Sequence, residues 1–493
     1  MSLIDLARAT LPRLPAPIRT PSYDVGAVVP GIVHLGLGGF HRAHMARYTH
    51  ALMEREPAAL AFGIVGAGLR PADKPLFDAL AAQDGLYALI ERSGTAETVT
   101  VIGALAGLAY AGEGAAALLD AASDPRICIL SLTVTENGYC LDPATKVLDP
   151  GHPLIRRDLA DPRRPASAIG VVVEALRRRR VAGHPAFTAL SCDNIQHNGG
   201  VLRGAVLALA RLQDPALADW IGAEVAFPST MVDRITPVTA PADIAHLAER
   251  YGLRDRWPVV CETFTQWIVE DRFPAGRPGW EAVGAQFVAD VEPYEAMKLR
   301  LLNASHLAVA GLGRLAGLTY IHETMRDPGL RAYMVALMDR ETGPTLPPVP
   351  GIDLPDYKRT LVERFANPAI QDTVERVNTD APLNVLLDPI RARLAGDRPI
   401  DLLALALAAW LRRMRGVDED GRAIEVRHPQ AALLRERAEA GGADPAPALA
   451  ITSLFGDLGR DPRLTVPTGK WLGSLYDRGS RATMARARSE LGF

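Results

Sequence analysis

The stretch Gly31-Ile-Val-His-Leu-Gly-Leu-Gly-Gly-Phe-His-Arg-Ala-His44 decides the fold of the first half of the chain. A short apolar run leads into a glycine-rich turn, and a helix-like stretch follows through Met53. This order is typical of a dinucleotide-binding fold, in which glycines let the backbone approach a pyrophosphate. Such turns also occur in α/β proteins without a cofactor. The cofactor-binding residues predicted here are Gly36, Gly38, Gly39, Phe40 and His41, although His41 takes the place of the third glycine.

A second strand is predicted at 62–68, and two charged residues that follow it bear on cofactor choice. Asp73 could bind the adenosine ribose of NAD, although it lies later than the usual offset. Arg70 could accept the 2′-phosphate of NADP. The pair therefore favours NAD and leaves NADP open. The simpler alternative is that Asp73 only caps the helix that follows.

The rest of the N-terminal half alternates strands with helices. Further strands are predicted at 87–91, 98–102, 127–134 and 187–191, and helices at 115–122, 166–180 and 200–212. This alternation predicts a mostly parallel sheet that binds ligands beyond the carboxyl ends of its strands. From about residue 290, helical stretches joined by proline-containing loops replace the strands. We therefore expect an α/β Rossmann-type domain over 1–289 and a mainly α-helical domain over 290–493.

The segment 294–306 is the centre of the second domain, because it carries three polar residues in an apolar helical pattern. At about 100° per residue, Lys298 and Asn303 would lie about 140° apart with His306 between them. All three could border one pocket only if the lysine stem reaches inward. The simpler alternative is a core helix with a lysine whose head extends to solvent.

Size and composition limit the classes of protein. The chain has 493 residues and 48% apolar content, which is enough for two substantial cores. A net charge of −3 gives no electrostatic reason to expect nucleic acid as a partner. The four cysteines are widely spaced, so we expect reduced thiols and no metal site. We find no signal peptide and no apolar run long enough to cross a membrane, and we expect a cytoplasmic protein.

Several motifs in fixed order resemble the polyol-specific long-chain dehydrogenases, and the resemblance covers nearly the whole chain. They are Gly36–His44, Ser191-Cys-Asp-Asn194, Met231-Val-Asp-Arg-Ile-Thr-Pro237, and Lys298 with Asn303 and His306. The resemblance implies a Rossmann-type domain, a mostly helical domain and a site in the cleft between them. It further implies a monomer that oxidises an open-chain polyol with NAD and without metal, with mannitol to fructose as the favoured reaction.

The resemblance also assigns roles to residues. It implies a general base, a pair of amides that hold the reacting oxygen, and a substrate-binding histidine, which are Lys298, Asn194 with Asn303, and His306. The positions that would contact substrate are Asp233, Arg376 and Asn384. The positions that would link the lysine to water are Glu136 and Glu295.

Two departures from the family concern specificity. Ala72 stands where some relatives have a second acid, which weakens discrimination against NADP. Asn384 lies in the run where close relatives carry a lysine, so the preferred polyol stays open. Arabinitol or sorbitol as substrate, a fructuronate-type reductase acting on a sugar acid, and a sensor that binds NAD(H) without turnover are the alternatives.

The chemistry explains why a lysine would be needed. Without a metal to acidify the alcohol, a side chain must remove the hydroxyl proton as hydride leaves carbon. Lowering the pKa of a lysine from about 10.4 to about 7.5 requires roughly 4 kcal/mol, which burial and the positive nicotinamide would supply. Glu295 would oppose this shift if it were ionised, and it could instead form an ordinary helix-surface ion pair with Lys298.

Overall fold

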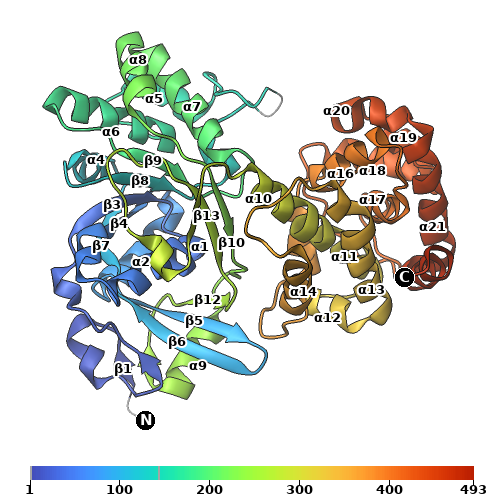
Figure 1. The fold of residues 1–493 in the computed structure, drawn as a ribbon, viewed down its shortest axis with the longest axis horizontal. Helices are drawn as coiled ribbons and strands as arrows, with labels where there is room; N and C mark the ends of the chain where they lie inside the picture. Colours follow the sequence, from blue (N-terminus) through green and yellow to red (C-terminus); the bar gives the residue numbers. More distant parts are fainter. Residues whose placement is uncertain (1–2, 143–144) are drawn as a thin grey trace. The chain divides into compact units, whose positions relative to one another are not determined.

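The computed structural model describes residues 3–142 and 145–493. The chain divides into two compact units, Met1–Val291 and Glu292–Phe493. Figure 1 shows the first unit as a mixture of strands and helices and the second as a group of helices.

A five-stranded parallel sheet forms the centre of the N-terminal unit. Its strands lie in the order β7-β4-β3-β8-β9, and each neighbouring pair is parallel. The strands are β3 Pro30–Leu35, β4 Gly63–Gly68, β7 Leu105–Tyr110, β8 Ile129–Leu132 and β9 Thr188–Ser191. The central strands have apolar residues at successive positions because helices cover both faces of such a sheet. The predicted fold class is confirmed.

Helices cover this sheet on both faces. One core cluster contains side chains of α4, α6 and α7, and a second contains side chains of α2 and α3. The helices of this unit are α1 Gly39–Ala43, α2 Met45–Met53, α3 Lys74–Ala81, α4 Ala116–Ser123, α5 Pro153–Ala160, α6 Ala168–Ala182, α7 Asn198–Gln213, α8 Pro215–Glu224 and α9 Pro241–Tyr251. The predicted helix at 166–180 is α6, which Ser167 caps and Gly183 ends at φ 70°.

Two of the predicted strands belong to a second sheet instead. β5 Tyr87–Ser93 and β6 Ala96–Ile102 form an antiparallel hairpin, which β12 Val259–Glu262 and β2 Ile18–Arg19 extend on either side. The prediction that the strands at 87–91 and 98–102 belong to the parallel sheet was therefore wrong. The reason is local, because only Gly94 and Thr95 separate the two strands, too few for the crossover that parallel strands need.

The remaining strands and short helices complete the N-terminal unit. β10 Thr230–Asp233, β13 Gln266–Glu270 and β14 Gln286–Val288 form a third sheet, and β1 Ile4–Asp5 pairs with β11 Leu253–Arg254. Short 3-10 helices are η1 Arg8–Arg13, η2 Val25–Ala27, η3 Pro57–Phe62, η4 Pro71–Asp73, η5 Glu136–Tyr139 and η6 Trp280–Val283.

The C-terminal unit is built from helices around α11 and α17, which are buried along almost their whole length. Its α-helices are α10 Glu292–Met297, α11 Ala304–Leu315, α12 Ile321–Arg326, α13 Pro328–Ala336, α14 Leu354–Phe365, α15 Val374–Asp380, α16 Asn384–Ala395, α17 Asp401–Arg413, α18 Ala431–Gly441, α19 Ala446–Leu449, α20 Thr452–Phe455 and α21 Pro462–Leu491. Two π-helical segments, η7 Lys298–Asn303 and η8 Leu337–Thr342, and the 3-10 helices η9 Gly343–Thr345 and η10 Gly456–Arg460 join them. Within the described residues, no helix is long and apolar enough to cross a membrane.

Candidate active site

The glycine turn between β3 and α1 is fixed by its contacts with the loop after β8. Gly36 has φ +94°, and a Cβ there would lie 2.1 Å from the carbonyl oxygen of Thr133, so only glycine fits. The Thr133 hydroxyl donates a hydrogen bond of 2.8 Å to the Gly36 carbonyl. By contrast, a Cβ on Gly38 or Gly39 would meet nothing closer than 3.7 Å. The backbone at these two glycines is therefore open to an approaching group.

His41 lies beneath this turn rather than in it. Its ring stacks on His34 of β3 with 3.4 Å between the ring centroids, and the residue is 1% exposed. Burial lowers the pKa of His34 to about 3 and that of His41 well below its usual value, so both rings are neutral. The side chain packs α1 against β3, and any contact of His41 with a cofactor would come from its backbone.

The Arg70 and Asp73 side chains bind each other. The Arg70 guanidinium lies 2.8 Å from the Asp73 carboxylate, which also accepts a hydrogen bond from the Arg70 backbone N–H. Asp73 makes no capping bond to α3, so the structure does not support the alternative of a helix cap. The Arg70 side chain is 78% exposed while that of Asp73 is 16% exposed. The acid is therefore the more fixed member of the pair.

Asp193 joins the loops that follow β8 and β9. Its carboxylate accepts hydrogen bonds from the backbone N–H of Val134 at 3.1 Å and of Thr135 at 2.7 Å, and from the Tyr139 hydroxyl at 2.9 Å. Thr135 has φ 64° and ψ 168°, a conformation that costs about 1–3 kcal/mol in a non-glycine residue and is found mainly at functional sites. Our sequence analysis missed a role for Asp193. Its signal was a carboxylate two residues after a buried strand, beside the predicted Asn194.

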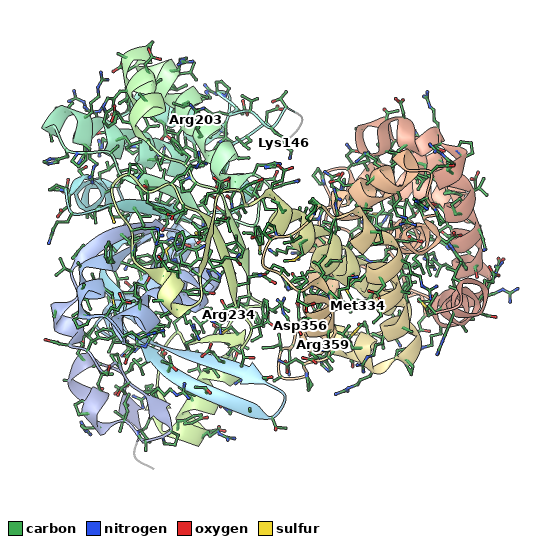
Figure 2. All side chains as sticks on the ribbon, viewed as in Figure 1. Lys146, Arg203, Arg234, Met334, Asp356 and Arg359 are labelled. Atoms are coloured by element: carbon green, nitrogen blue, oxygen red, sulfur yellow. The ribbon has the colours of Figure 1, made fainter. Side chains whose placement is uncertain are left out.

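Three predicted residues project from these strand ends. Asn194 and Glu136 are exposed, and Glu136 forms an ion pair of 2.7 Å with Lys146, which Figure 2 labels. Asp233 ends β10 and is 5% exposed. The Asn198 side chain connects the loop after β9 to β10, because it both donates to and accepts from the backbone of Thr230. Within the N-terminal unit, Glu136 and Asn194 therefore lie in the loops after the adjacent strands β8 and β9, and Asp233 lies at the end of β10 in the third sheet.

The neighbour of Asp233 shows how this edge is held. Arg234 has a side chain with 0% exposure, and it donates hydrogen bonds to the carbonyl oxygens of Ala43 and Glu262 and forms an ion pair with Glu91. Figure 2 labels Arg234 within the N-terminal unit. A guanidinium is suited to this place because its fork of N–H groups satisfies several carbonyls at once. Arg234 thus joins the helix after the glycine turn to the strands beside it.

The predicted helix around Lys298 exists, but its centre is a π-helix. η7 spans Lys298–Asn303, and the Ala304 N–H bonds to the carbonyl of Leu299, five residues back. Because a π-helix bonds residues five apart, Lys298 and Asn303 come close to one face. The predicted separation of about 140° was therefore wrong. Periodicity does not reveal a single π-helical turn, since the apolar pattern on either side continues.

The other predicted residues of the C-terminal unit lie on or near this run. Lys298, Glu295 and His306 are 8%, 6% and 7% exposed. Arg376 lies on α15, where the buried carboxylate of Asp372 joins it to His306. Asn384 is exposed at the start of α16 and lies apart from these contacts in the hydrogen bonds that the structure describes.

The four cysteines and the groups of side chains that could bind a metal bear on two further predictions. All four cysteines are buried free thiols. Burial raises the pKa of Cys128 to about 11 and that of Cys261 to about 12, so neither is a reactive thiolate. Among the described residues, we find no group of three His, Cys, Asp or Glu side chains placed to hold a metal ion.

A Rossmann-type unit with an open glycine turn, followed by a helical unit with a buried lysine, defines a nucleotide-dependent dehydrogenase. Comparison with known families identifies it further. The model described as "Mannitol dehydrogenase Rossmann domain" matches residues 30–282, and "Mannitol dehydrogenase C-terminal domain" matches residues 290–469. The chain belongs to the mannitol dehydrogenase family. The predicted family and enzyme class, a polyol dehydrogenase, are confirmed.

Related proteins and solved structures lead to the same class of enzyme. The chain is 43% identical over 449 residues to a mannitol 2-dehydrogenase of Aspergillus fumigatus, covering 89% of each chain. It is 42% identical to one of Cereibacter sphaeroides, covering 95% of this chain and 98% of that one. The ternary complex of Pseudomonas fluorescens mannitol 2-dehydrogenase with NAD and D-mannitol matches with a TM-score of 0.90 and 43% identity over 99% of this chain and 100% of that chain. A substrate-free D-sorbitol dehydrogenase matches with a TM-score of 0.88 and 35% identity over 97% of this chain and 100% of that chain.

Proposed function

We propose that this protein catalyses the NAD-dependent oxidation of an open-chain polyol to a ketose, with D-mannitol to D-fructose as the principal reaction, and the reverse reduction. The observation that carries this proposal is the match over 99% of the chain to a mannitol 2-dehydrogenase solved with NAD and D-mannitol. In this proposal residues 1–289 bind the cofactor and supply Glu136, Asn194 and Asp233, and residues 290–493 supply the base and the other substrate contacts. The protein acts as a monomer.

The glycine turn fits NAD. Gly38 and Gly39 leave open space beside their backbone, where a pyrophosphate needs close approach. The residues that would hold the cofactor are Gly36, Gly38, Gly39, Phe40, the backbone of His41, and Asp73 at the ribose. Asp73 also compensates the charge of Arg70, which weakens the attraction of Arg70 for a 2′-phosphate. This supports a preference for NAD over NADP.

In the reaction, Lys298 is the general base. Its Nζ takes the proton of the substrate hydroxyl while a hydride leaves the carbon that bears this hydroxyl. The alcohol thereby loses two electrons and becomes a ketone. NAD⁺ supplies the acceptor for the hydride when it is bound. The amide groups of Asn194 and Asn303 donate hydrogen bonds to the oxygen as negative charge develops on it. The π-helical turn supports this role, because it places Lys298 and Asn303 close to one face.

The proton then has to leave the lysine. Glu295, one helical turn before Lys298 and 6% exposed, is the first carrier, and the exposed Glu136 passes the proton to water. His306, Asp233, Arg376 and Asn384 bind the remaining hydroxyl groups of the polyol. A lysine base and two amide donors require no metal ion.

A second candidate substrate is D-sorbitol, supported by the 35% identity to a D-sorbitol dehydrogenase over 97% of this chain. The exposed Asn384, in place of a lysine, keeps arabinitol open as well. A fructuronate-type reductase would need an additional cation to bind the substrate carboxylate, and Asn384 provides none. A non-enzymatic NAD(H) sensor would have no use for Lys298, Asn303 and His306 together.

The test is the initial rate of NAD⁺ reduction with mannitol, sorbitol and arabinitol, in the presence of a chelator and repeated with NADP⁺. We expect the highest kcat/KM for mannitol with NAD⁺, and no effect of the chelator. Faster turnover of sorbitol or arabinitol would show that this polyol, and not mannitol, is the principal substrate, and the proposed mechanism would be unchanged. Absence of turnover on all three, with activity on fructuronate and NADH, would reject the proposed function.

A further inference from the structure

Asp372 is a buried acid that contacts two predicted substrate-binding residues at once. Its side chain is 4% exposed. The Arg376 guanidinium binds it with both prongs, Nε to Oδ1 and Nη2 to Oδ2, each at 2.6 Å. The second oxygen also lies 3.6 Å from Nε2 of His306, a contact that is longer than a hydrogen bond. One carboxylate thus links a side chain on α15 to a side chain on α11.

The backbone of Asp372 is fixed independently of these partners. Its carbonyl accepts a hydrogen bond of 2.9 Å from the N–H of Ile321, and the next residue, Thr373, forms a β-bridge with Tyr320 and caps α15. His306 is also held on its other side, where its ring stacks on Phe365 at 4.3 Å. The Asp372 carboxylate is therefore held in place by its own backbone, and the side chains of Arg376 and His306 lie against it.

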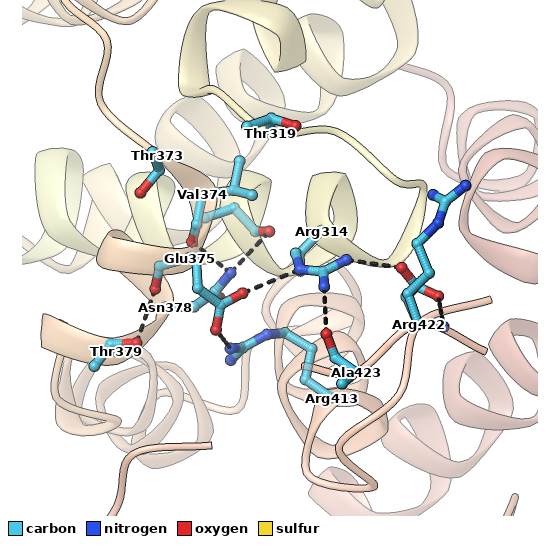
Figure 3. A network of polar contacts seen from close by, with 12 residues as sticks. Arg314, Thr319, Thr373, Val374, Glu375, Asn378, Thr379, Arg413, Arg422 and Ala423 are labelled. Carbon is cyan, nitrogen blue, oxygen red and sulfur yellow. Dashed lines mark hydrogen bonds and ion pairs between the residues drawn. The ribbon is translucent and has the colours of Figure 1, made fainter. Parts of the chain in front are cut away.

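A second network, which Figure 3 shows, anchors α15 through Glu375 and Asn378. Glu375 pairs with Arg314 of α11 at 3.0 Å and with the buried Arg413 of α17 at 3.6 Å. The Asn378 side chain donates to the carbonyl of Ala310 on α11. This network holds α15 against the helix that carries His306, without contacting His306 or Arg376 in the bonds that the structure describes. It offers a matched control for Asp372.

We propose that Asp372 is the positioning residue of the substrate pocket: it keeps a proton on Nε2 of His306 and holds the Arg376 fork in place, so that both side chains meet the polyol already oriented. This inference rests on the proposed function for its effect on substrate, but not for the tautomer. A carboxylate beside one ring nitrogen favours a proton on that nitrogen. Orientation before binding lowers the conformational entropy that binding would otherwise lose.

The first experiment measures the tautomer directly and needs no turnover. Long-range ¹H–¹⁵N correlation spectra of the ¹⁵N-histidine-labelled protein report which ring nitrogen carries the proton, and the spectrum of a His306→Gln variant identifies the signals of His306. We expect the Nε2–H form in the wild-type protein and a population of the Nδ1–H form in Asp372→Asn. The Nδ1–H form as the main wild-type species would overturn the inference.

The second experiment separates positioning from general stability. Asp372→Asn keeps the shape of the side chain and removes its charge, so we expect KM for the polyol to rise about tenfold or more while kcat and NAD affinity change little. Glu375→Gln, three residues away, should lower the thermal midpoint and leave KM within about twofold. An unchanged KM in Asp372→Asn, or an equal KM change in both variants, would overturn the inference.

The two experiments also distinguish the two proposals. If the wild-type protein turns over no polyol while His306 carries its proton on Nε2, the proposed function fails and the positioning of His306 stands. If Asp372→Asn does not fold, the wild-type tautomer decides alone.

Discussion

The strand-end loops of the N-terminal unit and the helical run of the C-terminal unit present their proposed site residues in different ways. In the loops, a carboxylate and several backbone N–H groups fix the chain, and Asn194 and Glu136 project from it exposed. On the helical run, the side chains of Glu295, Lys298 and His306 are themselves buried. The first region is organised through its backbone, and the second through one π-helical turn and the contacts of its side chains.

This difference predicts how each region responds to substitution. A change of an exposed loop side chain should disturb the loop little, because Asp193 and the backbone N–H groups of Val134 and Thr135 hold it. A change of a buried side chain on the helical run also alters its neighbours. The loops are held in place by buried residues, of which Asp193 is the main example, because it accepts hydrogen bonds from Val134, Thr135 and Tyr139.

Lys298→Ala should have the largest effect. Because it removes the only proposed base, we expect kcat to fall about 10³-fold or more at neutral pH. NAD⁺ affinity, measured by fluorescence titration or calorimetry, should stay within about twofold, since the glycine turn lies in the other unit. Turnover within tenfold of wild type at saturating substrate would remove Lys298 from the mechanism.

Asn194→Ala and Asn303→Ala compare the two regions directly. Each should lower kcat by about 10²- to 10³-fold, the usual effect of losing one oxyanion donor. The difference should appear in stability: Asn194 is exposed and its loss should lower the thermal midpoint less than the loss of Asn303, which ends the π-helical turn. Equal stability losses in both variants would contradict the distinction between the regions.

Asp193→Asn should have a smaller effect, which combines a loss of stability with a fall in kcat. The neutral amide accepts fewer of the three hydrogen bonds from Val134, Thr135 and Tyr139, and it no longer stabilises the strained Thr135 with a full charge. We expect a loss of about 1–3 kcal/mol in the free energy of unfolding, and a fall in kcat through misplacement of Asn194. Denaturant titration and steady-state kinetics measure both. Loss of stability with unchanged kcat would show that Asp193 serves the fold alone.

Substitution of Glu97, which lies on β6 in the second sheet, should affect stability only. Burial alone would raise the pKa of Glu97, but hydrogen bonds from His246, Arg92 and Tyr251 lower it to about 2. A carboxyl with a depressed folded-state pKa stabilises the fold above its unfolded value of about 4.5, and this stability is lost as pH falls toward 2. Glu97→Gln should therefore lower the free energy of unfolding by about 1–3 kcal/mol at pH 7 and progressively less below pH 4.5. A difference that does not change with pH would contradict the assignment, and kcat should stay unchanged.

Sequence alone predicted the elements that follow from short-range pattern. The strand, glycine turn and helix at 30–53, the later strands β8 and β9 and the change to helices near 290 all have clear apolar periods or glycine signals. Glu136 and Asn194 lie in the loops after β8 and β9, at the carboxyl ends of the strands where the alternation predicts ligand binding. The family resemblance supplied the roles of the site residues, which remain predictions.

The features that sequence did not predict depend on contacts between distant residues. The π-helical turn leaves the apolar pattern intact, so Lys298 and Asn303 were placed on different faces. The hairpin β5–β6 is an exception, because the two-residue connection Gly94-Thr95, too short for a parallel crossover, can be read from the sequence itself. Asp193 and Asp372 were missed because their importance lies in which donors they meet, and no spacing along the chain reveals those partners.

The central claim, that Lys298 is the general base, is tested most directly by chemical rescue of Lys298→Ala. Small primary amines, added at several pH values during mannitol oxidation, can replace the missing side chain if it acts in proton transfer. We predict that the rate rises in proportion to the concentration of the unprotonated amine, and that wild type and Asn303→Ala show no such rise. A rate in Lys298→Ala that is independent of amine at every pH, with NAD⁺ still bound and the protein folded, would contradict the account.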